Sequence, residues 1–377
     1  MRRFLVITSI SFLGFIAGAA SAESNATNSR PKSVLFVLSS EGKYQGKTRP
    51  GYEMDELAQA WSIFRANGVH TAFASPRGGA AEADKFNPAD PANAQLLADP
   101  EASAALKQTQ AIAQVDPKRH DAIYVVGGKG AMFDLATDKA LIGLLGDFYE
   151  RGGVVAAICH GSAALADVRR ADGKYLVTGR AVTGFTEEEE TIFGKKWRKE
   201  FPFEIEPTLR ERGALWKEAP LMMPSVAIDG RLLTGQNPFS TGRLADAVLR
   251  ALGIEPAARE FRKDEASMAL AEQAIQGDRS AAAVLASAPA NYQPELIAML
   301  GHFQLQVAQD EKSVRTALTI MDLAAPYFED NRLSVSRAEA LSSLGRTEEA
   351  RTILAAVLAK APDMPEALKL QGKLPVK

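Results

Sequence analysis

The sequence predicts a doubly wound α/β domain built on a parallel sheet, followed by an all-helical region at the C-terminal end. Two observations indicate the first part. Short, continuous apolar runs alternate with segments of helical apolar spacing, and each run is typical of a strand that is buried on both faces. A third observation indicates the second part: after about residue 257 no strand pattern is present, alanine becomes frequent and the apolar spacing is helical throughout.

The predicted strands are apolar, rich in β-branched residues and bounded by turn residues. In chain order they cover 33–39, 70–74, 121–126, 153–158, 226–229 and 232–234. The predicted helices cover 51–67, 105–114, 141–149 and 241–252. The stretch 76–104 is rich in Pro, Gly, Ala and Asp, so we expect a long irregular excursion there. In such a domain the functional site lies at the carboxyl ends of the strands.

Composition excludes several classes of protein. The chain has 377 residues, of which 46% are hydrophobic and 24% charged, which is typical of a globular protein with two or three domains. Lys and Arg number 44 against 46 Asp and Glu, so there is no basic excess to bind nucleic acid. Four His and one Cys exclude a disulfide scaffold and disfavour a metal site. We also expect no dinucleotide cofactor, because no GxGxxG follows the first strand.

The first 22 residues have the pattern of a secretory signal peptide. Arg2 and Arg3 give a positive start, an apolar stretch follows, and Ala20-Ser21-Ala22 offers small residues for cleavage. Thr, Ser and Gly interrupt the apolar stretch, which disfavours a permanent membrane anchor. We therefore expect cleavage after residue 22, a flexible tail over 23–31, a periplasmic location and no stable membrane insertion.

The helical region at 257–377 contains a repeat-like pattern. Small or apolar residues fall at tetratricopeptide offsets, namely Ala338, Leu341, Gly345, Ala350, Leu354, Val357 and Pro362. Fewer than three clear copies are present, and such units bury their faces only against neighbours. This tetratricopeptide-like region is expected to bind a protein or peptide partner, to self-associate, or to cover the catalytic domain at 32–256.

Cys159 is the candidate nucleophile. It follows the buried strand 153–158 and begins a predicted helix, so its thiol is expected at the carboxyl edge of the sheet. The positive end of a helix would favour the thiolate, and its backbone amides would form an oxyanion site. His160 offers a proton carrier near neutral pH. The alternative is a buried, inert cysteine that packs as a small hydrophobic residue.

Several spaced motifs surround this cysteine in one order. They are Ser75-Pro76-Arg77-Gly78-Gly79, Val126-Gly127-Gly128-Lys129-Gly130-Ala131, Ala157-Ile158-Cys159-His160-Gly161, Thr183-Gly184-Phe185-Thr186-Glu187-Glu188-Glu189 and Gly235-Gln236-Asn237-Pro238. Together they resemble the ThiJ/PfpI superfamily of glutamine-amidotransferase-like proteins, in the branch that contains heat-shock chaperones and glutathione-independent glyoxalase III. The resemblance covers residues 32–254, implies a flavodoxin-like fold and does not reach the helical region.

The resemblance implies that a glutamate on the helix after the first strand completes the Cys159–His160 pair. Glu56 occupies the matching position, and Glu53, one turn earlier on the same helical face, is the competing candidate. The resemblance also implies that the backbone amides of Gly128 and His160 donate to an oxyanion.

Two charged features near these motifs, Lys129 and the glutamates at 187–190, can each be interpreted as functional or as solvent-facing. Relatives in this branch often have His after the two glycines, where this chain has Lys129. Lys129 is a candidate substrate-binding residue, as is Glu53, and the alternative for Lys129 is a solvent-facing side chain. The four glutamates at 187–190 are expected to form a solvated helix start, because acids are favourable near a helix N-terminus.

The activity implied by the resemblance is a glyoxalase-III-like lyase reaction that needs no glutathione, metal or other cofactor. Cys159 would add to a small carbonyl substrate, a 2-oxoaldehyde such as methylglyoxal, as a hemithioacetal. Glu56, with His160, would then move a proton from C1 to C2 and lead to a 2-hydroxy acid. The alternatives are peptidase-like or deglycase-like hydrolysis, a chaperone or interaction module that uses the helical array, and a redox-sensing cysteine.

Overall fold

The computed structural model describes residues 30–375, and its α/β part is built on a seven-stranded sheet in the order β3-β2-β1-β4-β5-β9-β8. The strands are β1 Ser33–Val37, β2 His70–Ser75, β3 Gln110–Ala111, β4 Ala122–Val125, β5 Val154–Ile158, β8 Val226–Asp229 and β9 Leu232–Gly235. Neighbouring strands are parallel except at one edge, where β8 pairs antiparallel with β9. The predicted doubly wound sheet is thus confirmed as a mostly parallel sheet with one antiparallel edge strand.

An aromatic cluster packs against the centre of this sheet. The parallel register of β1 sets Phe36 beside Phe73 of β2 and Tyr124 of β4. The ring centroid of Phe36 lies 5.7 Å from that of Phe73 and 5.3 Å from that of Tyr124. Phe64, from the first helix, adds a further edge contact to Tyr124. Residues 34–37 are fully buried, which explains why this strand is a continuous apolar run in the sequence.

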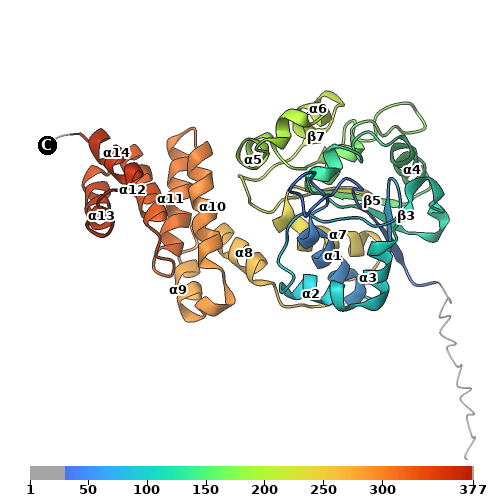
Figure 1. Ribbon diagram of the computed structural model, residues 1–377, viewed down its shortest axis with the longest axis horizontal. Helices are drawn as coiled ribbons and strands as arrows, with labels where there is room; N and C mark the ends of the chain where they lie inside the picture. Colours follow the sequence, from blue (N-terminus) through green and yellow to red (C-terminus); the bar gives the residue numbers. More distant parts are fainter. Residues whose placement is uncertain (1–29, 376–377) are drawn as a thin grey trace, which may run out of the picture. The chain divides into compact units, whose positions relative to one another are not determined.

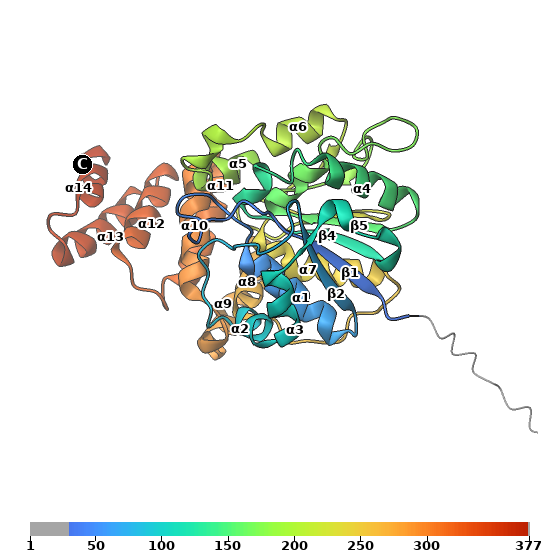
Figure 2. The same ribbon diagram turned by 45° about the vertical axis from the view of Figure 1, so that its right-hand side comes forward.

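Helices cover both faces of the sheet (Figure 1). α1 Met54–Ala66 and α7 Thr241–Ala251 contact each other on one face, and α4 Lys139–Glu150 lies on the other face in both views (Figure 2). These three helices match the predicted helices at 51–67, 241–252 and 141–149. The long segment between β5 and β8 contains α5 Glu187–Phe193, α6 Ile205–Glu211 and a small sheet of β6 Ala181–Val182 and β7 Leu215–Trp216.

The predictions for 76–104 and 105–114 are only partly correct, because 76–90 is irregular and 105–107 is helical as expected, whereas the rest differs. Two short helices, α2 Pro91–Ala98 and α3 Pro100–Lys107, occupy this stretch, and β3 then pairs with the end of β2. Asp90 and Asp99 cap the two helices by accepting hydrogen bonds from the backbone N–H groups of Ala92 and Ala102. Each cap is followed by proline at the first helical position, where proline is favoured. The Asp-Pro pairs that suggested an irregular loop are therefore helix starts.

Beyond α7 the described chain forms helices and no further strand. They are α8 Lys263–Ile275, α9 Ser280–Ser287, the short 3₁₀ turn η7 Pro289–Asn291, α10 Pro294–Val307, α11 Glu311–Ala324, α12 Asn331–Ser343, α13 Thr347–Lys360 and α14 Pro365–Lys373. α10 packs on α11 and α12 packs on α13, and their buried faces form a separate hydrophobic core. The prediction of an all-helical region is confirmed. Its tetratricopeptide character, its partners and the domain limit at residue 256 stay predictions.

The predicted signal peptide at 1–22 and most of the predicted tail at 23–31 lie outside the described residues. Within residues 30–375, no helix combines the length and apolar character needed to cross a membrane.

Candidate active site

Cys159 lies on a strained turn at the carboxyl end of β5. Its backbone φ is +55°, in the left-handed region that non-glycine residues seldom adopt, and the 3₁₀ helix η4 Cys159–Leu165 begins at this residue. Gly161 is required by the close approach of the neighbouring strand β4, because a Cβ there would lie 2.6 Å from the Val125 carbonyl oxygen. Strain of this kind often occurs at functional sites. The turn directs the only thiol of the chain into a pocket.

Glu56 approaches the thiol from α1. Its side chain is fully buried, and its Oε2 accepts a hydrogen bond of 2.8 Å from the Gly127 backbone N–H. A Cβ at Gly127 would lie 2.6 Å from that oxygen and 2.7 Å from the Cys159 Cβ, so only glycine leaves room for the pair. The Glu56 carboxyl also hydrogen-bonds the Cys159 thiol. Its other oxygen, Oε1, is buried without a hydrogen-bond partner among the described residues.

Burial and mutual repulsion govern the protonation of this pair. Burial raises the pKa of Glu56 well above its usual value, and the neighbouring Glu53 raises it further. Burial also raises the pKa of the Cys159 thiol, with the charge of Glu56 as the next cause. The backbone N–H of His160 at the start of η4 does lower the thiol pKa, as expected of a helix N-terminus, but burial has the larger effect and the net pKa is raised. A protonated Glu56 removes the repulsion and can donate to the sulfur, so the two groups share protons as a unit.

His160 connects the thiol to a second glutamate. Its Nδ1 lies 3.3 Å from the Cys159 sulfur, and its Nε2 lies 2.9 Å from Oε2 of Glu190. The imidazole ring stacks on Phe185 with centroids 4.3 Å apart, and only 2% of the residue is exposed. A carboxylate on the far nitrogen fixes the orientation and tautomer of an imidazole. Cys159, His160 and Glu190 thus form a chain with the geometry of a catalytic triad.

The expectation that the glutamates at 187–190 are solvated was wrong for two of the four. Glu189 and Glu190 are 1% and 4% exposed, whereas Glu187 and Glu188 face solvent. Thr186 caps α5 in a capping box with Glu189, which sets the helical phase and turns both buried acids inward. That Thr-x-x-Glu spacing was the signal in the sequence that could have separated the four acids.

Glu189 holds the segments that face Cys159 across the pocket. Its Oε1 accepts hydrogen bonds from the Asn237 side chain at 2.8 Å, the Gln236 side chain at 3.2 Å and the Met222 backbone N–H at 3.1 Å. Burial raises the pKa of Glu189 to about 7. One carboxyl therefore connects α5 to the loop before β8 and to the Gly235–Pro238 motif.

The predicted substrate-binding residues also border the pocket. Glu53 and Lys129 both line it, together with Asp84, which the sequence did not single out. Burial raises the pKa of Glu53 to about 7, with the charges of Asp55 and Asp84 adding to the effect and that of Lys129 opposing it. Glu53 influences Glu56 through its charge, whereas the hydrogen bond to the thiol comes from Glu56. The geometry therefore favours Glu56 over Glu53 as the partner of Cys159.

The residues of the two predicted oxyanion donors, Gly128 and His160, both line the pocket. The His160 backbone N–H hydrogen-bonds the Cys159 sulfur, and Gly128 lines the pocket with a φ of +92°. A Cβ at Gly128 would lie 2.6 Å from the Glu53 backbone nitrogen, so glycine is required at this close approach. The role of the two backbone amides as oxyanion donors stays a prediction.

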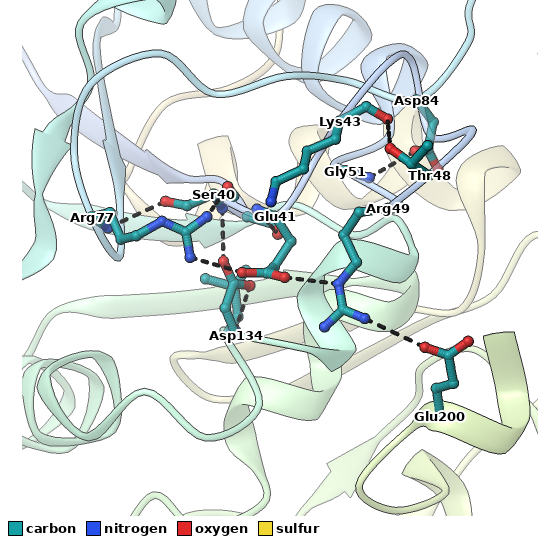
Figure 3. A network of polar contacts seen from close by, with 12 residues as sticks. Ser40, Glu41, Lys43, Thr48, Arg49, Gly51, Arg77, Asp84, Asp134 and Glu200 are labelled. Atoms are coloured by element: carbon teal, nitrogen blue, oxygen red, sulfur yellow. Dashed lines mark hydrogen bonds and ion pairs between the residues drawn. The ribbon is translucent and has the colours of Figure 1, made fainter.

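A polar network holds the loop between β1 and α1 that brings Gly51 and Glu53 to the site (Figure 3). Glu41 accepts from Arg49 at 2.8 Å and from Arg77 at 2.7 Å, and Asp134 accepts from the Ser40 backbone N–H at 2.7 Å. At the far end of the loop, Asp84 accepts from the Gly51 backbone N–H at 2.7 Å. The Gly51 carbonyl then accepts from the Gly130 N–H at 3.0 Å, which connects the loop to the glycine motif.

The pocket is small and has several large apolar side chains in its lining. Its volume is about 240 Å³, below the usual range for drug-sized ligands. These side chains are Phe185, Phe193, Met222 and Phe239. Among the described residues, no group of His, Cys, Asp and Glu has the arrangement of a metal site. The site thus offers a thiol, an imidazole and a buried carboxyl to a small molecule.

Comparisons with known proteins agree with this arrangement. The model of the DJ-1/PfpI family matches residues 48–251. Glyoxalase 3 of Candida albicans is 29% identical over 229 residues, which are 58% of this chain and 97% of that protein. Glutathione-independent glyoxalase hsp3101 of Schizosaccharomyces pombe is 29% identical over 242 residues, which are 58% of this chain and 94% of that protein.

Two solved structures share the fold. Rapid Encystment Protein 24 KDa of Francisella tularensis superposes with a TM-score of 0.55 and 31% identity, over 59% of this chain and 99% of that one. The crystal structure of glyoxalase III from Candida albicans gives a TM-score of 0.54 and 27% identity, over 58% of this chain and 97% of that one. The resemblance inferred from the sequence motifs is confirmed. Since the family model matches more than half of its residues, the chain belongs to the DJ-1/PfpI family.

Proposed function

We propose that this protein is a cysteine-dependent enzyme that converts a 2-oxoaldehyde such as methylglyoxal into a 2-hydroxy acid without glutathione. One observation carries the proposal: the only thiol lies between the buried carboxyl of Glu56 and the imidazole of His160, in a pocket of about 240 Å³. The names of the relatives from Candida albicans and Schizosaccharomyces pombe point to the same activity.

The proposed reaction begins when the Cys159 sulfur adds to the aldehyde carbon, C1. The thiol proton passes to the former aldehyde oxygen by way of His160, which lies 3.3 Å from the sulfur, and a hemithioacetal results. The Gly128 and His160 backbone amides stabilise the oxyanion that forms on the way.

The second stage moves hydrogen between the two carbons. Glu56 gives the proton it holds to the C2 carbonyl oxygen, and its carboxylate, together with His160, then removes the C1 proton and delivers it to C2. The C1 hydroxyl proton returns to Glu56, so that C1 is oxidised to a thioester while the C2 ketone is reduced to an alcohol. Water then cleaves the thioester, releases the 2-hydroxy acid and restores the thiol. The net change adds one water to the substrate and needs no external oxidant or reductant. Burial raises the pKa of Glu56 well above its usual value, which favours a carboxyl that holds a proton to give to the substrate.

A redox-sensing role has weaker support. Sensor cysteines are exposed and have a lowered pKa, whereas Cys159 is 3% exposed and burial raises its pKa.

The test is incubation of the full chain with methylglyoxal in the absence of glutathione, with the product identified by NMR. The proposal predicts stoichiometric lactate. Consumption without lactate, or no turnover by protein with a demonstrably free thiol, would refute it.

We also propose export to the periplasm, on the pattern of residues 1–22 alone. Mass spectrometry of the N-terminus of protein from periplasmic extract tests this, and an uncleaved N-terminus in the cytoplasmic fraction would contradict it.

A further inference from the structure

One wall of the pocket is shared with the C-terminal helices. Phe193 at the end of α5, Met222 in the loop before β8, and Phe239 in the 3₁₀ helix η6 Pro238–Ser240 all line the pocket. Met222 belongs to the hydrophobic core of the helical region, and Phe193 and Phe239 pack against it. We call these three residues the outer wall. Each has substrate space on one side and the helical region on the other.

Two neighbouring residues of α10 make specific contacts with the outer wall. The ring of Phe303 meets that of Phe193 edge-on, with centroids 5.1 Å apart and an interplanar angle of 77°. The Gln304 side chain is 5% exposed and donates a hydrogen bond of 3.0 Å to the Leu221 carbonyl oxygen. Leu221 directly precedes Met222, whose backbone N–H donates to Glu189. Helix α10 is thus connected to two of the three segments that carry the outer wall.

We infer that Phe303 and Gln304 are positioning residues that set the size of the carbonyl substrate by fixing Phe193 and Met222 against the pocket. The helical region then completes the active site and is more than an independent binding module. This inference rests on the proposed function for the identity of the substrate, but the geometry of the wall is independent of turnover.

The physical basis is what the partners on the outer wall lose when an α10 side chain is removed. Without the Phe303 ring, Phe193 loses an aromatic partner and has room to turn away from the pocket. Without the Gln304 amide, the buried Leu221 carbonyl lacks a donor and the Met222 loop is free to shift. Both changes widen the pocket and leave Cys159, Glu56 and His160 in place. The expected consequence is a change in which molecules reach the thiol, without a uniform loss of reactivity.

Because Cys159 is the only cysteine, thiol labelling reports access to this pocket and nothing else. We propose to label the full-length Phe303→Ala and Gln304→Leu variants with a small reagent, methyl methanethiosulfonate, and a bulky aromatic one, 5,5′-dithiobis(2-nitrobenzoate). The labelling rate with the bulky reagent, divided by the labelling rate with the small reagent, should rise about two- to tenfold over wild type. This is the range expected for the loss of one aromatic or hydrogen-bonding contact.

Phe328→Ala is the matched control. Phe328 is also partly buried against the core of the helical region, but it is not among the residues that line the pocket. Its loss should destabilise the helices and leave the labelling ratio unchanged. An unchanged ratio in both α10 variants, or an equal rise in Phe328→Ala, would show that α10 only stabilises the fold and would overturn the inference.

Steady-state kinetics with methylglyoxal and the larger phenylglyoxal provide the second readout. In the α10 variants the ratio of kcat/KM for phenylglyoxal to kcat/KM for methylglyoxal should rise by about two- to tenfold, because the same contact is lost. If the wild-type chain turns over neither compound, the proposed function fails while the labelling ratio still decides the inference. If turnover is present but neither ratio moves, the inference fails and the proposed function stands.

Discussion

The inner wall of the pocket, made of Cys159, Glu56 and Gly128, and its outer wall, made of Phe193, Met222 and Phe239, come from different kinds of segment. The inner wall is built where β4 and β5 end and α1 begins, so the hydrogen bonds of the sheet determine its geometry. The outer wall comes from three separate segments that Glu189 and α10 hold together. The reacting groups and the residues that set the substrate size therefore come from different parts of the chain. Variants in the inner wall should lose turnover, whereas variants in the outer wall should change which substrates are accepted.

The largest effect among carboxyl variants is expected for Glu56→Gln. The substitution keeps the size of the side chain and an acceptor for the Gly127 N–H, but it removes the proton that the carboxyl holds. We expect kcat to fall about 10²- to 10⁴-fold, the usual contribution of general acid–base catalysis. Glu53→Gln is the matched control on the same helix and should cost less than about tenfold, because Glu53 affects Glu56 only through charge. A larger loss in Glu53→Gln would reverse the assignment.

A smaller loss is expected for Glu190→Gln. The amide can no longer hold His160 in the orientation and tautomer that suit the thiol, so kcat should fall between about tenfold and about a thousandfold. Glu188→Gln, two residues earlier on the exposed side of α5, should leave kcat unchanged. Equal losses in both variants would mean that the helix contributes only stability and that the triad geometry is incidental.

The next effect leaves the chemistry aside and is on stability, and it concerns Glu189, the carboxyl that holds the outer wall. The pKa of Glu189 is about 7 in the folded chain against 4.5 ordinarily, so the folded state binds more protons than the unfolded state between these values. Its contribution to the free energy of unfolding is complete below pH 4.5 and is lost as the pH rises through about 7. The difference between wild type and Glu189→Gln should therefore fall by on the order of 3 kcal/mol over that range, as measured by urea denaturation. A difference that rises with pH would contradict the buried, protonated state.

The contrast between the walls also explains what could be predicted from the sequence. The strands at whose ends the inner wall lies are buried on both faces and therefore appear as continuous apolar runs in the sequence. The glycine motifs mark close approaches that only glycine permits. The fold and the residues of the inner wall follow from such local patterns together with the family motifs. The same patterns do not give the protonation of the pair, because the pKa depends on burial.

The outer wall could not be predicted for a different physical reason. Whether a glutamate in the run at 187–190 is buried depends on contacts with Asn237, Met222 and His160, which lie far away in the sequence. Phe303 is an ordinary apolar position of a helix, and nothing local marks it as the neighbour of Phe193. The helices at 91–107 were missed because Asp-Pro starts a helix as readily as a turn.

The most direct test of the proposed reaction is removal of the Cys159 thiol. We would measure lactate formation from methylglyoxal by the wild-type chain and by Cys159→Ala, without glutathione and at equal amounts of folded protein. We expect the variant to lose at least about a thousandfold in kcat, because the hemithioacetal and the thioester both require this sulfur, while its thermal unfolding is nearly unchanged. Turnover in Cys159→Ala at a rate close to that of wild type would show that this cysteine does not carry the reaction.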